Sequence, residues 1–496
     1  MKRLTFLLIG AISISFTLQA QTYDADAVRF SMIEFGSTAR GLGVAGAFGS
    51  VGADFSAISI NPAGLGFYTK GEFTITPNLQ FSNTESIFQS NQTKKETYMP
   101  GISNLGLAFG KVKKENGFAS RSGLVGGGFA IGYNRLNNFN GKTHFKGLNS
   151  SNSITDAYLA EINDPANQWI AVDFDNFSYE TVLGYTTWLV NEIDSSGVYN
   201  SPVTGAVEQE GTINVSGAMD ELTVAVAGNY SHKLYFGASV GVPILRYKRE
   251  FDYSETDDAD NIEDFRSMNV AQEYESTGWG FNAKFGLIYK PVKWIRLGAS
   301  IQTPTAISLD ENYSSKMTST FDSVSYSDES PLGVFDYEII MPWRFNSGIS
   351  VFLSKYGFLS FDYEYVDYAS MNYDFGIGNE DFENNVNDLM KAKYTATSNF
   401  RFGAEFAIDR FRLRAGYAFF GSPFKPGVAV DNLDLSREMF SGGFGFRLKK
   451  VFIDLAYART KTSEFGSPYM LTNGEEPSVK SEINKDTYSL TFGYRF

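Results

Sequence analysis

The last nine residues, "YSLTFGYRF" (residues 488–496), alternate without a break between two kinds of side chain. The large apolar side chains share one face: Tyr488, Leu490, Phe492, Tyr494 and Phe496. The opposite face carries Ser489, Thr491 and Arg495. A period of two residues indicates a β-strand. Aromatic residues on one face and polar residues on the other suit a strand that has lipid outside and water inside.

The same alternation recurs along the chain and predicts an all-β fold. An even number of antiparallel strands closes a single-chain barrel, so the pattern indicates a 14-stranded transmembrane β-barrel within residues 71–496. The fourteen predicted strands lie at 71–83, 98–111, 122–136, 219–231, 233–252, 271–289, 292–310, 334–353, 357–374, 394–408, 410–421, 437–448, 450–463 and 485–496.

The connections between these strands alternate between short and long, as the two ends of an outer-membrane barrel require. The long ones include 84–97, 137–218 and 253–270, which we expect outside the cell, with 137–218 as a long extracellular loop. The short turns and the C-terminus then lie in the periplasm, and the N-terminus lies in the periplasm or the lumen. Many strands exceed the roughly 10 residues that cross lipid, so the barrel is expected to project beyond the membrane.

The N-terminus has the three parts of a secretory signal. Lys2 and Arg3 precede an apolar run that ends at the small residue Ala20, which predicts a signal peptide at residues 1–20. The protein carries a net charge of −14, so we expect no nucleic-acid partner. Cysteine is absent, so disulfides and thiol chemistry are excluded.

Residues 21–70 precede the first predicted strand and are rich in small residues. Gly41, Gly43 and Gly46 have the G-x-G-x-x-G spacing of a dinucleotide-binding turn, but no parallel βαβ unit surrounds them. A barrel of this size leaves a lumen unless something fills it. The sequence therefore predicts an N-terminal hatch inside the barrel, with these glycines on its packing face.

The stretch "GSTARGLGVAGAFGSVGADFSAISINPAGLGFY" (residues 36–68) resembles the hatch of the FadL/TodX family of outer-membrane transporters for long-chain fatty acids and other hydrophobic compounds. Asn61, Pro62 and Ala63 match the hatch motif of that family. Later segments, among them "IIMPWRFNSGISVFLSKYGFLSFDYEYVDYASM" (residues 339–371), resemble the later strands of the family in the same order.

The resemblance implies passive uptake of a hydrophobic small molecule. The ligand is captured outside, moves to a site beside the hatch, and leaves sideways into the membrane lipid through a kinked third strand. Consecutive glycines favour a bend in a strand, so we predict the lateral opening at Gly126, Gly127 and Gly128; a packing surface for the hatch is the alternative. As candidate ligand-binding residues we assign Phe30, Phe35 and Phe48.

One feature departs from the family, whose outer groove is built from long third and fourth loops. Here the second outer loop, 137–218, is long and the third, 253–270, is short. The apolar residues of the long second loop suit a lid over the barrel or a ligand groove. A rival function is a surface receptor for haem or another hydrophobic ligand, with the barrel displaying this loop. An open aqueous porin is a third possibility.

Few residues offer chemistry. The two histidines, His144 and His232, are predicted at opposite ends of the barrel and outside any catalytic motif, so we expect no enzyme, no catalytic residue, no cofactor and no metal site. His144 or a tyrosinate is the haem ligand that the receptor alternative requires. The acidic runs at 255–264 and 379–388 are expected to be solvated loops, with Ca²⁺ binding as the alternative.

Charged residues on the inner faces of the predicted strands are expected to pair across the lumen. They are Asp362, Glu364, Arg401, Glu405, Arg412, Arg414, Arg447, Asp454 and Arg495. The terminal Phe496 fits the signal read by the barrel-assembly machinery of the outer membrane. We therefore expect a monomer in the cell outer membrane whose other partners are lipid and a hydrophobic ligand.

Overall fold

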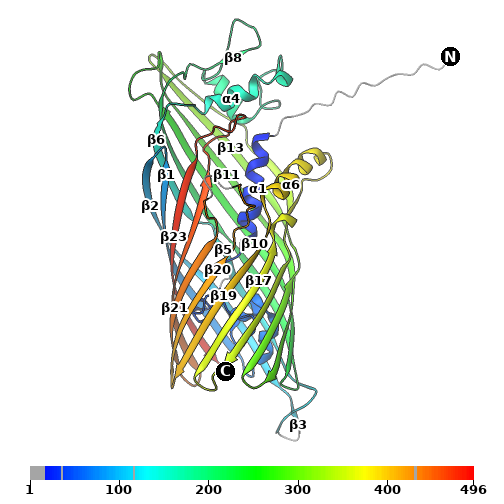
Figure 1. The fold of residues 1–496 in the computed structure, drawn as a ribbon. Coiled ribbons are helices and arrows are strands. Elements are labelled where there is room, and N and C mark those ends of the chain that lie inside the picture. The colour runs from blue at the N-terminus through cyan, green and yellow to red at the C-terminus, as the bar shows by residue number, and fades with distance from the viewer. Residues whose placement is uncertain (1–16, 35–36, 116–117, 429–432) are drawn as a thin grey trace, which may run out of the picture.

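The computed structural model describes residues 17–34, 37–115, 118–428 and 433–496 and shows a closed antiparallel barrel (Figure 1). The wall has fourteen strand positions, as predicted, and it closes where the first strand pairs with the last. The strands are β1 (Glu72–Phe88), β2 (Asn91–Val112), β5 (Leu124–Asn138), β9 (Val207–Tyr230), β10 (Leu234–Thr256), β11 (Phe265–Val292), β12 (Ile295–Gln302) with β13 (Thr305–Phe321), β15 (Gly333–Met341) with β16 (Arg344–Phe352), β17 (Gly357–Asp367), β19 (Ala396–Ile408), β20 (Phe411–Phe420), β21 (Arg437–Arg447), β22 (Val451–Gly466) and β23 (Val479–Arg495).

Two of the fourteen positions are split by proline. Pro304 separates β12 from β13, and Pro342 separates β15 from β16. Proline has no backbone N–H to donate to a neighbouring strand, so the pairing is interrupted at these points. Shorter strands extend the wall: β6 (Gly141–Asn149), β14 (Ser325–Glu329) and β18 (Asn372–Asp374). Four two-residue strands complete the set: β3 (Lys114–Glu115), β4 (Phe118–Ala119), β7 (Asn191–Glu192) and β8 (Tyr199–Asn200).

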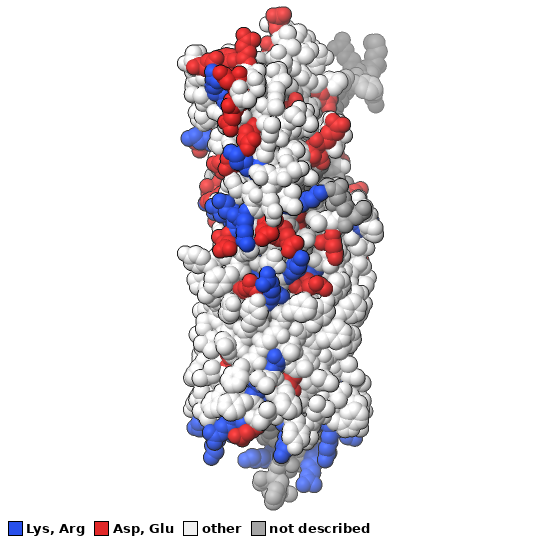
Figure 2. Space-filling model, turned by 60° about the vertical axis from the view of Figure 1, so that its left-hand side comes forward, with Lys and Arg blue, Asp and Glu red and all other residues white. Residues whose placement is uncertain are grey.

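The alternation of side chains between the two faces is confirmed. On β23, Leu490 is 46% exposed on the outer face and Thr491 is fully buried on the inner face. Exposed tryptophans and tyrosines lie toward both edges of the apolar band, as in membrane barrels. They are Tyr98, Trp279, Trp343 and Tyr365 on one side and Tyr230, Tyr289, Trp294 and Tyr356 on the other. Figure 2 shows this nearly uncharged band, with lysine and arginine below it.

Among the described residues, no helix is both long and apolar enough to cross a membrane.

The strands extend further than their pattern predicts. Residues 84–97 form the ends of β1 and β2 around a turn at Gln89 and Ser90, rather than a loop. The segment 137–218 also consists of strand at both ends: it includes the end of β5, all of β6 and the first half of β9. Only residues 150–206, between β6 and β9, form the connection. Beyond the lipid the outer face of a strand contacts water, so its outward residues need not be apolar and the alternation that marks a strand weakens there.

Residues 150–206, which we call the cap, cover the upper end of the barrel in Figure 1. The cap contains α4 (Thr155–Ile162), η2 (Pro165–Asn167) and α5 (Tyr179–Thr186). Tyr158 and Leu183 are buried in one apolar cluster with Met317 of the wall. Trp169 and Trp188 are 71% and 55% exposed, so part of the apolar surface of the cap faces outward.

The N-terminal segment lies inside the barrel in two parts. Helix α1 (Thr17–Ser31) occupies the upper lumen (Figure 1) and packs beside α6 (Glu380–Lys393). The lower lumen holds α2 (Ala39–Leu42), α3 (Phe55–Ile60) and η1 (Pro62–Phe67); the remaining helix, η3 (Tyr368–Ser370), follows β17. We use the name hatch for residues 37–68, which fill the lower lumen. The signal-peptide prediction falls mostly on residues 1–16, which lie outside the described residues.

Candidate ligand channel and hatch

Two of the three predicted packing glycines, Gly41 and Gly43, lie where little room exists for a side chain. A Cβ atom built on Gly41 would come 2.6 Å from Oγ of Ser56, and one on Gly43 would come 3.3 Å from the wall at Gly443. Gly46 has φ of +75°, a left-handed conformation that glycine adopts without strain. Gly41 and Gly43 thus have little room for a side chain, Gly46 is set by its backbone conformation, and a packing face formed by all three stays a prediction.

Asn61 connects the hatch to the wall. Its Nδ2 donates to the carbonyl of Gly49 at 2.8 Å within the hatch, and to the carbonyls of Leu287 and Ala299 at 3.1 and 3.3 Å on two wall strands. Its Oδ1 accepts from the N–H of Ala63 at 3.1 Å, which caps the helix that Pro62 begins. One amide side chain thus holds a hatch loop, a helix start and two strands.

Wall glycines allow this approach. A Cβ on Gly286 would lie 1.9 Å from Oδ1 of Asn61, and one on Gly237 would lie 2.5 Å from the backbone of Pro62. Any other residue at these two positions would push the hatch inward. The same close contact recurs around the circumference, and we call these wall residues the glycine belt: Gly106, Gly132, Gly237, Gly286, Gly298, Gly403, Gly416 and Gly443.

A buried chain of charges also anchors the hatch, as the predicted pairing of lumen charges requires. Arg40 of the hatch contacts Glu405 through two hydrogen bonds of 2.9 and 3.1 Å. Glu405 also pairs with Arg414 at 2.7 Å, and Arg414 pairs with Asp454 at 2.8 Å. Burial alone lowers the pKa of Arg40, but Glu405 and Asp54 raise the pKa above its ordinary value, so this guanidinium stays charged.

Most of the remaining lumen charges also have partners, and Arg412 is the exception. Glu364 lies between Arg344 and Arg401, each at 3.0 Å, and Asp362 accepts a hydrogen bond from the N–H of Gly49 at 2.6 Å. Arg412 instead donates to backbone carbonyls beside its own turn.

The glycines assigned to the lateral opening are paired on both sides, next to a register shift with β9 between Leu124 and Gly126. Gly126, Gly127 and Gly128 pair with β2 on one side and with β9 on the other. A Cβ on Gly128 would lie 3.0 Å from Cγ of Leu65, so this residue faces the hatch. Both the opening and the packing surface stay predictions for these residues, although Gly128 has the contact that the packing surface requires.

An interruption in the wall lies further along the same strand. Strand β5 pairs with β2 only over Asn104–Val112. Within the described residues, Asn91–Ile102 of β2 pair with β1 alone. We call the stretch between Asn91–Ile102 and the facing residues 135–149 the seam. Side chains bridge it: Asn91 donates to the carbonyl of Lys146 at 2.8 Å, and Thr93 donates to that of His144.

The seam begins inside the apolar band, because Ile102 of β2 is 43% exposed on the outer face. The N-terminal segment contacts its inner side. The N–H of Glu34 donates to the carbonyl of Leu136 at 2.7 Å, and Asn137 donates to the carbonyl of Met32 at 2.8 Å. Leu136 lies at a bulge in β5, where the register with β9 shifts. The segment that precedes the hatch therefore holds the bulged strand edge.

The three candidate ligand-binding residues do not come together. Phe30 lies in the upper lumen, where buried aromatic side chains pack together in a region that we call the chamber. Its ring centroid lies 5.6 Å from that of Phe139 and 5.5 Å from that of Tyr247. Phe48 packs on Phe358 at 6.1 Å, in a separate cluster of the lower lumen. Phe35 lies outside the described residues. Ligand contact by these phenylalanines stays a prediction.

Several groups in the chamber and at the seam were not predicted from the sequence. Tyr23 of α1 donates to Glu311 at 3.1 Å, and Tyr274 donates to the same carboxylate at 3.0 Å. Single polar residues on long strands give no signal of this clustering. At the seam the sequence did contain an indication. Pro100 and Gly101 lie in the part of β2 that pairs with β1 alone, and proline within a strand is typical of an edge.

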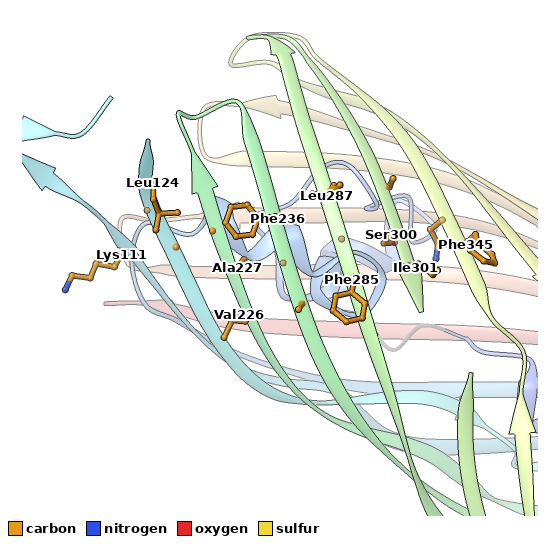
Figure 3. A pocket seen from close by; sticks show the side chains of 18 of the residues that line it. Lys111, Leu124, Val226, Ala227, Phe236, Phe285, Leu287, Ser300, Ile301 and Phe345 are labelled. Carbon is orange, nitrogen blue, oxygen red and sulfur yellow. The ribbon is translucent and has the colours of Figure 1, made fainter. Parts of the chain in front are cut away.

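An apolar cavity of about 1210 Å³ lies on the lipid-facing side of the wall (Figure 3). Phe236, Phe285 and Leu287 line it from β10 and β11, and the hatch passes behind these strands. Lys111 and Phe345 mark its two ends in Figure 3. Gly126 and Gly127 line the end near Lys111.

Neither the histidines nor the acidic runs form a metal site in the described part of the chain. His144 lies on β6 with Nδ1 3.1 Å from Oγ1 of Thr212, and His232 lies in the turn before β10. The run 379–388 is not a loop: from Glu380 it forms α6, which buries Val386 and Met390. Among the described residues no group of three or more histidines and acids is placed to hold a metal ion.

A barrel with an aromatic-edged apolar band, an interruption in its wall and a packed hatch defines a plugged outer-membrane transport protein. Residues 229–496 match the model of the family described as outer membrane protein transport protein (OMPP1/FadL/TodX). The chain belongs to this family, so it is an outer-membrane transport protein and not an enzyme.

Solved structures support the fold. A FadL homologue from Pseudomonas aeruginosa aligns with a TM-score of 0.53 and 13% identity, over 94% of this chain and 99% of that chain. The toluene transporter TodX from Pseudomonas putida aligns with a TM-score of 0.50 and 13% identity, over 92% of this chain and 98% of that chain. A sequence search of curated proteins finds no match.

Proposed function

We propose that this protein is a passive channel for hydrophobic small molecules, which leave the lumen sideways through the seam into the membrane. The observation that carries the proposal is the loss of backbone pairing along Asn91–Ile102, a stretch that begins inside the apolar band at Ile102 and continues beyond it. Spanning strands normally satisfy all their backbone groups by pairing, so an unpaired edge inside the lipid band is costly unless it has a use.

The lining of the route suits an apolar ligand. The upper lumen is an aromatic chamber in which Phe30, Phe139 and Tyr247 meet, and residues 32–34 lie between this chamber and the seam. A ligand that displaces residues 32–34 also removes the hydrogen bonds to Leu136 and Asn137 that hold the edge of β5. Movement of residues 21–35 would then couple ligand arrival to the opening.

A covalent bridge across the seam tests the route. The protein has no cysteine, so Gly101→Cys and Arg135→Cys can be joined by a short bis-methanethiosulfonate, which forms a reducible disulfide with each thiol and releases sulfinate. A Cβ on Gly101 lies 3.5 Å from Nη1 of Arg135, which places the two positions within reach. The matched control is Ser82→Cys with Thr97→Cys, which joins two residues already paired between β1 and β2.

We expect the bridged seam to abolish uptake of a fluorescent long-chain fatty acid into cells or proteoliposomes, and the bridged control to retain uptake. Cleavage of the reagent should restore transport. Uptake by the bridged seam variant at the rate of the control would overturn the lateral route.

The proposal also covers how the barrel is inserted into the membrane and how many copies form the working unit. Phe496 is 51% exposed at the end of β23, where a C-terminal recognition signal for the assembly machinery is accessible. We propose a single barrel as the working unit, since the hatch, chamber and seam all lie within one chain.

A further inference from the structure

The lipid-facing cavity is shaped by the size of its outward residues. Gly228, Ala238 and Ala299 give it a shallow floor, and Phe236, Phe285 and Leu287 stand around this floor. Gly228 pairs directly with Phe236, whose ring lies over the position of the missing Cβ. The inward glycines of these strands are explained by contact with the hatch, whereas Ala238 and Ala299 face away from it. The result is a trough along an otherwise convex wall.

The trough ends at a strongly basic part of the barrel rim. Lys111 and Lys113 line its lower end. The segments 111–123, 231–233 and 290–293 at this rim contain seven lysines and arginines and a single acid, Glu115, although the whole chain carries a net charge of −14. The seven basic residues are Lys111, Lys113, Lys114, Arg121, Lys233, Lys290 and Lys293. Figure 2 shows lysine and arginine gathered at this end of the barrel.

We propose that this trough binds an anionic phospholipid of the periplasmic leaflet. An acyl chain lies against the floor formed by Ala238 and Ala299, and the phosphate lies beside Lys111 and Lys113. Lysine places its apolar stem along the barrel and its ammonium at the level of the headgroups, where it attracts phosphate. Acyl chain and headgroup thus find complementary surfaces at the two ends of one cavity. The lipid site lies apart from the seam and does not depend on the seam being the transport route.

The experiment measures retained lipid by native mass spectrometry. Purified protein in detergent is titrated with phosphatidylglycerol and phosphatidylethanolamine of identical acyl chains. We expect one retained lipid, with a preference for phosphatidylglycerol of roughly ten- to thirtyfold, since each of two lysines near an anionic headgroup contributes about fivefold. Equal retention of the two lipids would overturn the proposal.

Two pairs of variants separate the parts of the site. Ala238→Phe with Ala299→Phe fills the trough and should abolish retention, whereas Ala415→Phe, at an exposed position on β20, should not. Lys111→Gln with Lys113→Gln should remove the headgroup preference and leave weak retention of both lipids. Lys449→Gln with Lys450→Gln, in the turn before β22, should leave the preference unchanged.

Three results would contradict the proposal. Retention unaffected by Ala238→Phe with Ala299→Phe would place the lipid elsewhere. Free fatty acid displacing phosphatidylglycerol at equal concentration would assign the trough to a transported compound. A protein dimer that disappears when the trough is filled would make a second copy of the chain its occupant.

Discussion

Single residues set the distance between the hatch and the wall. The amide of Asn61 reaches two strand carbonyls because Gly286 has no side chain, and Pro62 lies directly on Gly237. Interiors are packed so closely that one additional methyl group forces a shift of its neighbours. The glycine belt is therefore a requirement of the hatch and not of the barrel itself.

The variant Gly286→Ala tests this requirement. The new methyl group would overlap Oδ1 of Asn61, so we expect the hatch to be destabilised by about 1–3 kcal/mol while the barrel remains folded. Hydrogen exchange of residues 37–68 should accelerate, and heat-modified migration on gels should stay normal. Gly466→Ala is the control, because no atom lies within 4 Å of its new Cβ. Equal exchange in both variants would contradict a close hatch contact.

At the scale of elements, the segment between α1 and α2 connects the hatch to the seam. Glu34 lies 3.6 Å from Lys485 and 3.7 Å from Arg437. Burial raises the pKa of Glu34, but these two cations outweigh burial and bring the pKa below its ordinary value of 4.5. An acid with a lowered pKa stabilises the docked segment above its ordinary pKa, and this contribution is lost as the pH falls through the lowered pKa.

We therefore expect the segment to loosen in acid. A spin label on Met32→Cys, in this cysteine-free chain, should be immobile at pH 7 and become mobile as the pH falls below 4.5. In a Glu34→Gln background the label should already be more mobile at pH 7, and its mobility should no longer depend on pH. An unchanged pH profile in the Glu34→Gln variant would assign the effect to another group.

The cap is fixed to the barrel by one buried carboxylate. Glu255 accepts hydrogen bonds from Ser153 at 2.5 Å, from the N–H of Ile154 at 2.8 Å and from Gln209 at 2.9 Å. Tyr253 donates to it at 2.7 Å. Ser153 and Ile154 lie directly before α4, so this single side chain positions the first helix of the cap.

The variant Glu255→Ala leaves these donors without an acceptor. Hydrogen bonds to charged groups are worth about 1.5–3 kcal/mol each, so we expect the cap to be destabilised by at least about 3 kcal/mol. Protease should then cut within residues 150–206 while the barrel resists. Glu263→Ala, at an exposed acid nearby, should be cut no faster than the natural protein. Resistance of the Glu255→Ala cap would show that its apolar cluster suffices.

At the scale of the whole molecule, the lumen is filled from end to end. The hatch occupies the lower part, α1 and its aromatic partners occupy the upper part, and the cap covers the upper mouth. Charges follow the long axis, with acids gathered at the cap end and lysine and arginine at the opposite rim in the face shown in Figure 2. The molecule is organised as a closed tube with one interrupted side.

A filled lumen should not conduct ions. We expect purified protein to give almost no current steps in planar bilayers, in contrast to an open porin inserted in the same membrane. Steady conductance from the intact protein would identify an aqueous pore and contradict the fold described for the hatch and cap.

The strand pattern could be predicted because lipid imposes it. Each membrane-crossing strand must place apolar residues outward every second position, and residues 488–496 show this rule without exception. The extra length of β1, β2 and β9 could not be predicted, because beyond the lipid the outward residues are no longer required to be apolar. The hatch was predicted from its small residues and its Asn61-Pro62-Ala63 motif.

The sequence by itself thus determined the barrel and its strand number through periodicity, and the hatch through its small residues. The transport class followed from the resemblance of these segments to a known family. Only the tertiary structure decided where the wall is interrupted, which carbonyls Asn61 contacts and how the Arg40–Glu405 anchor forms. These features join residues that are tens to hundreds of positions apart. Strand register and barrel closure bring them together, and neither is encoded in the alternation of any single strand.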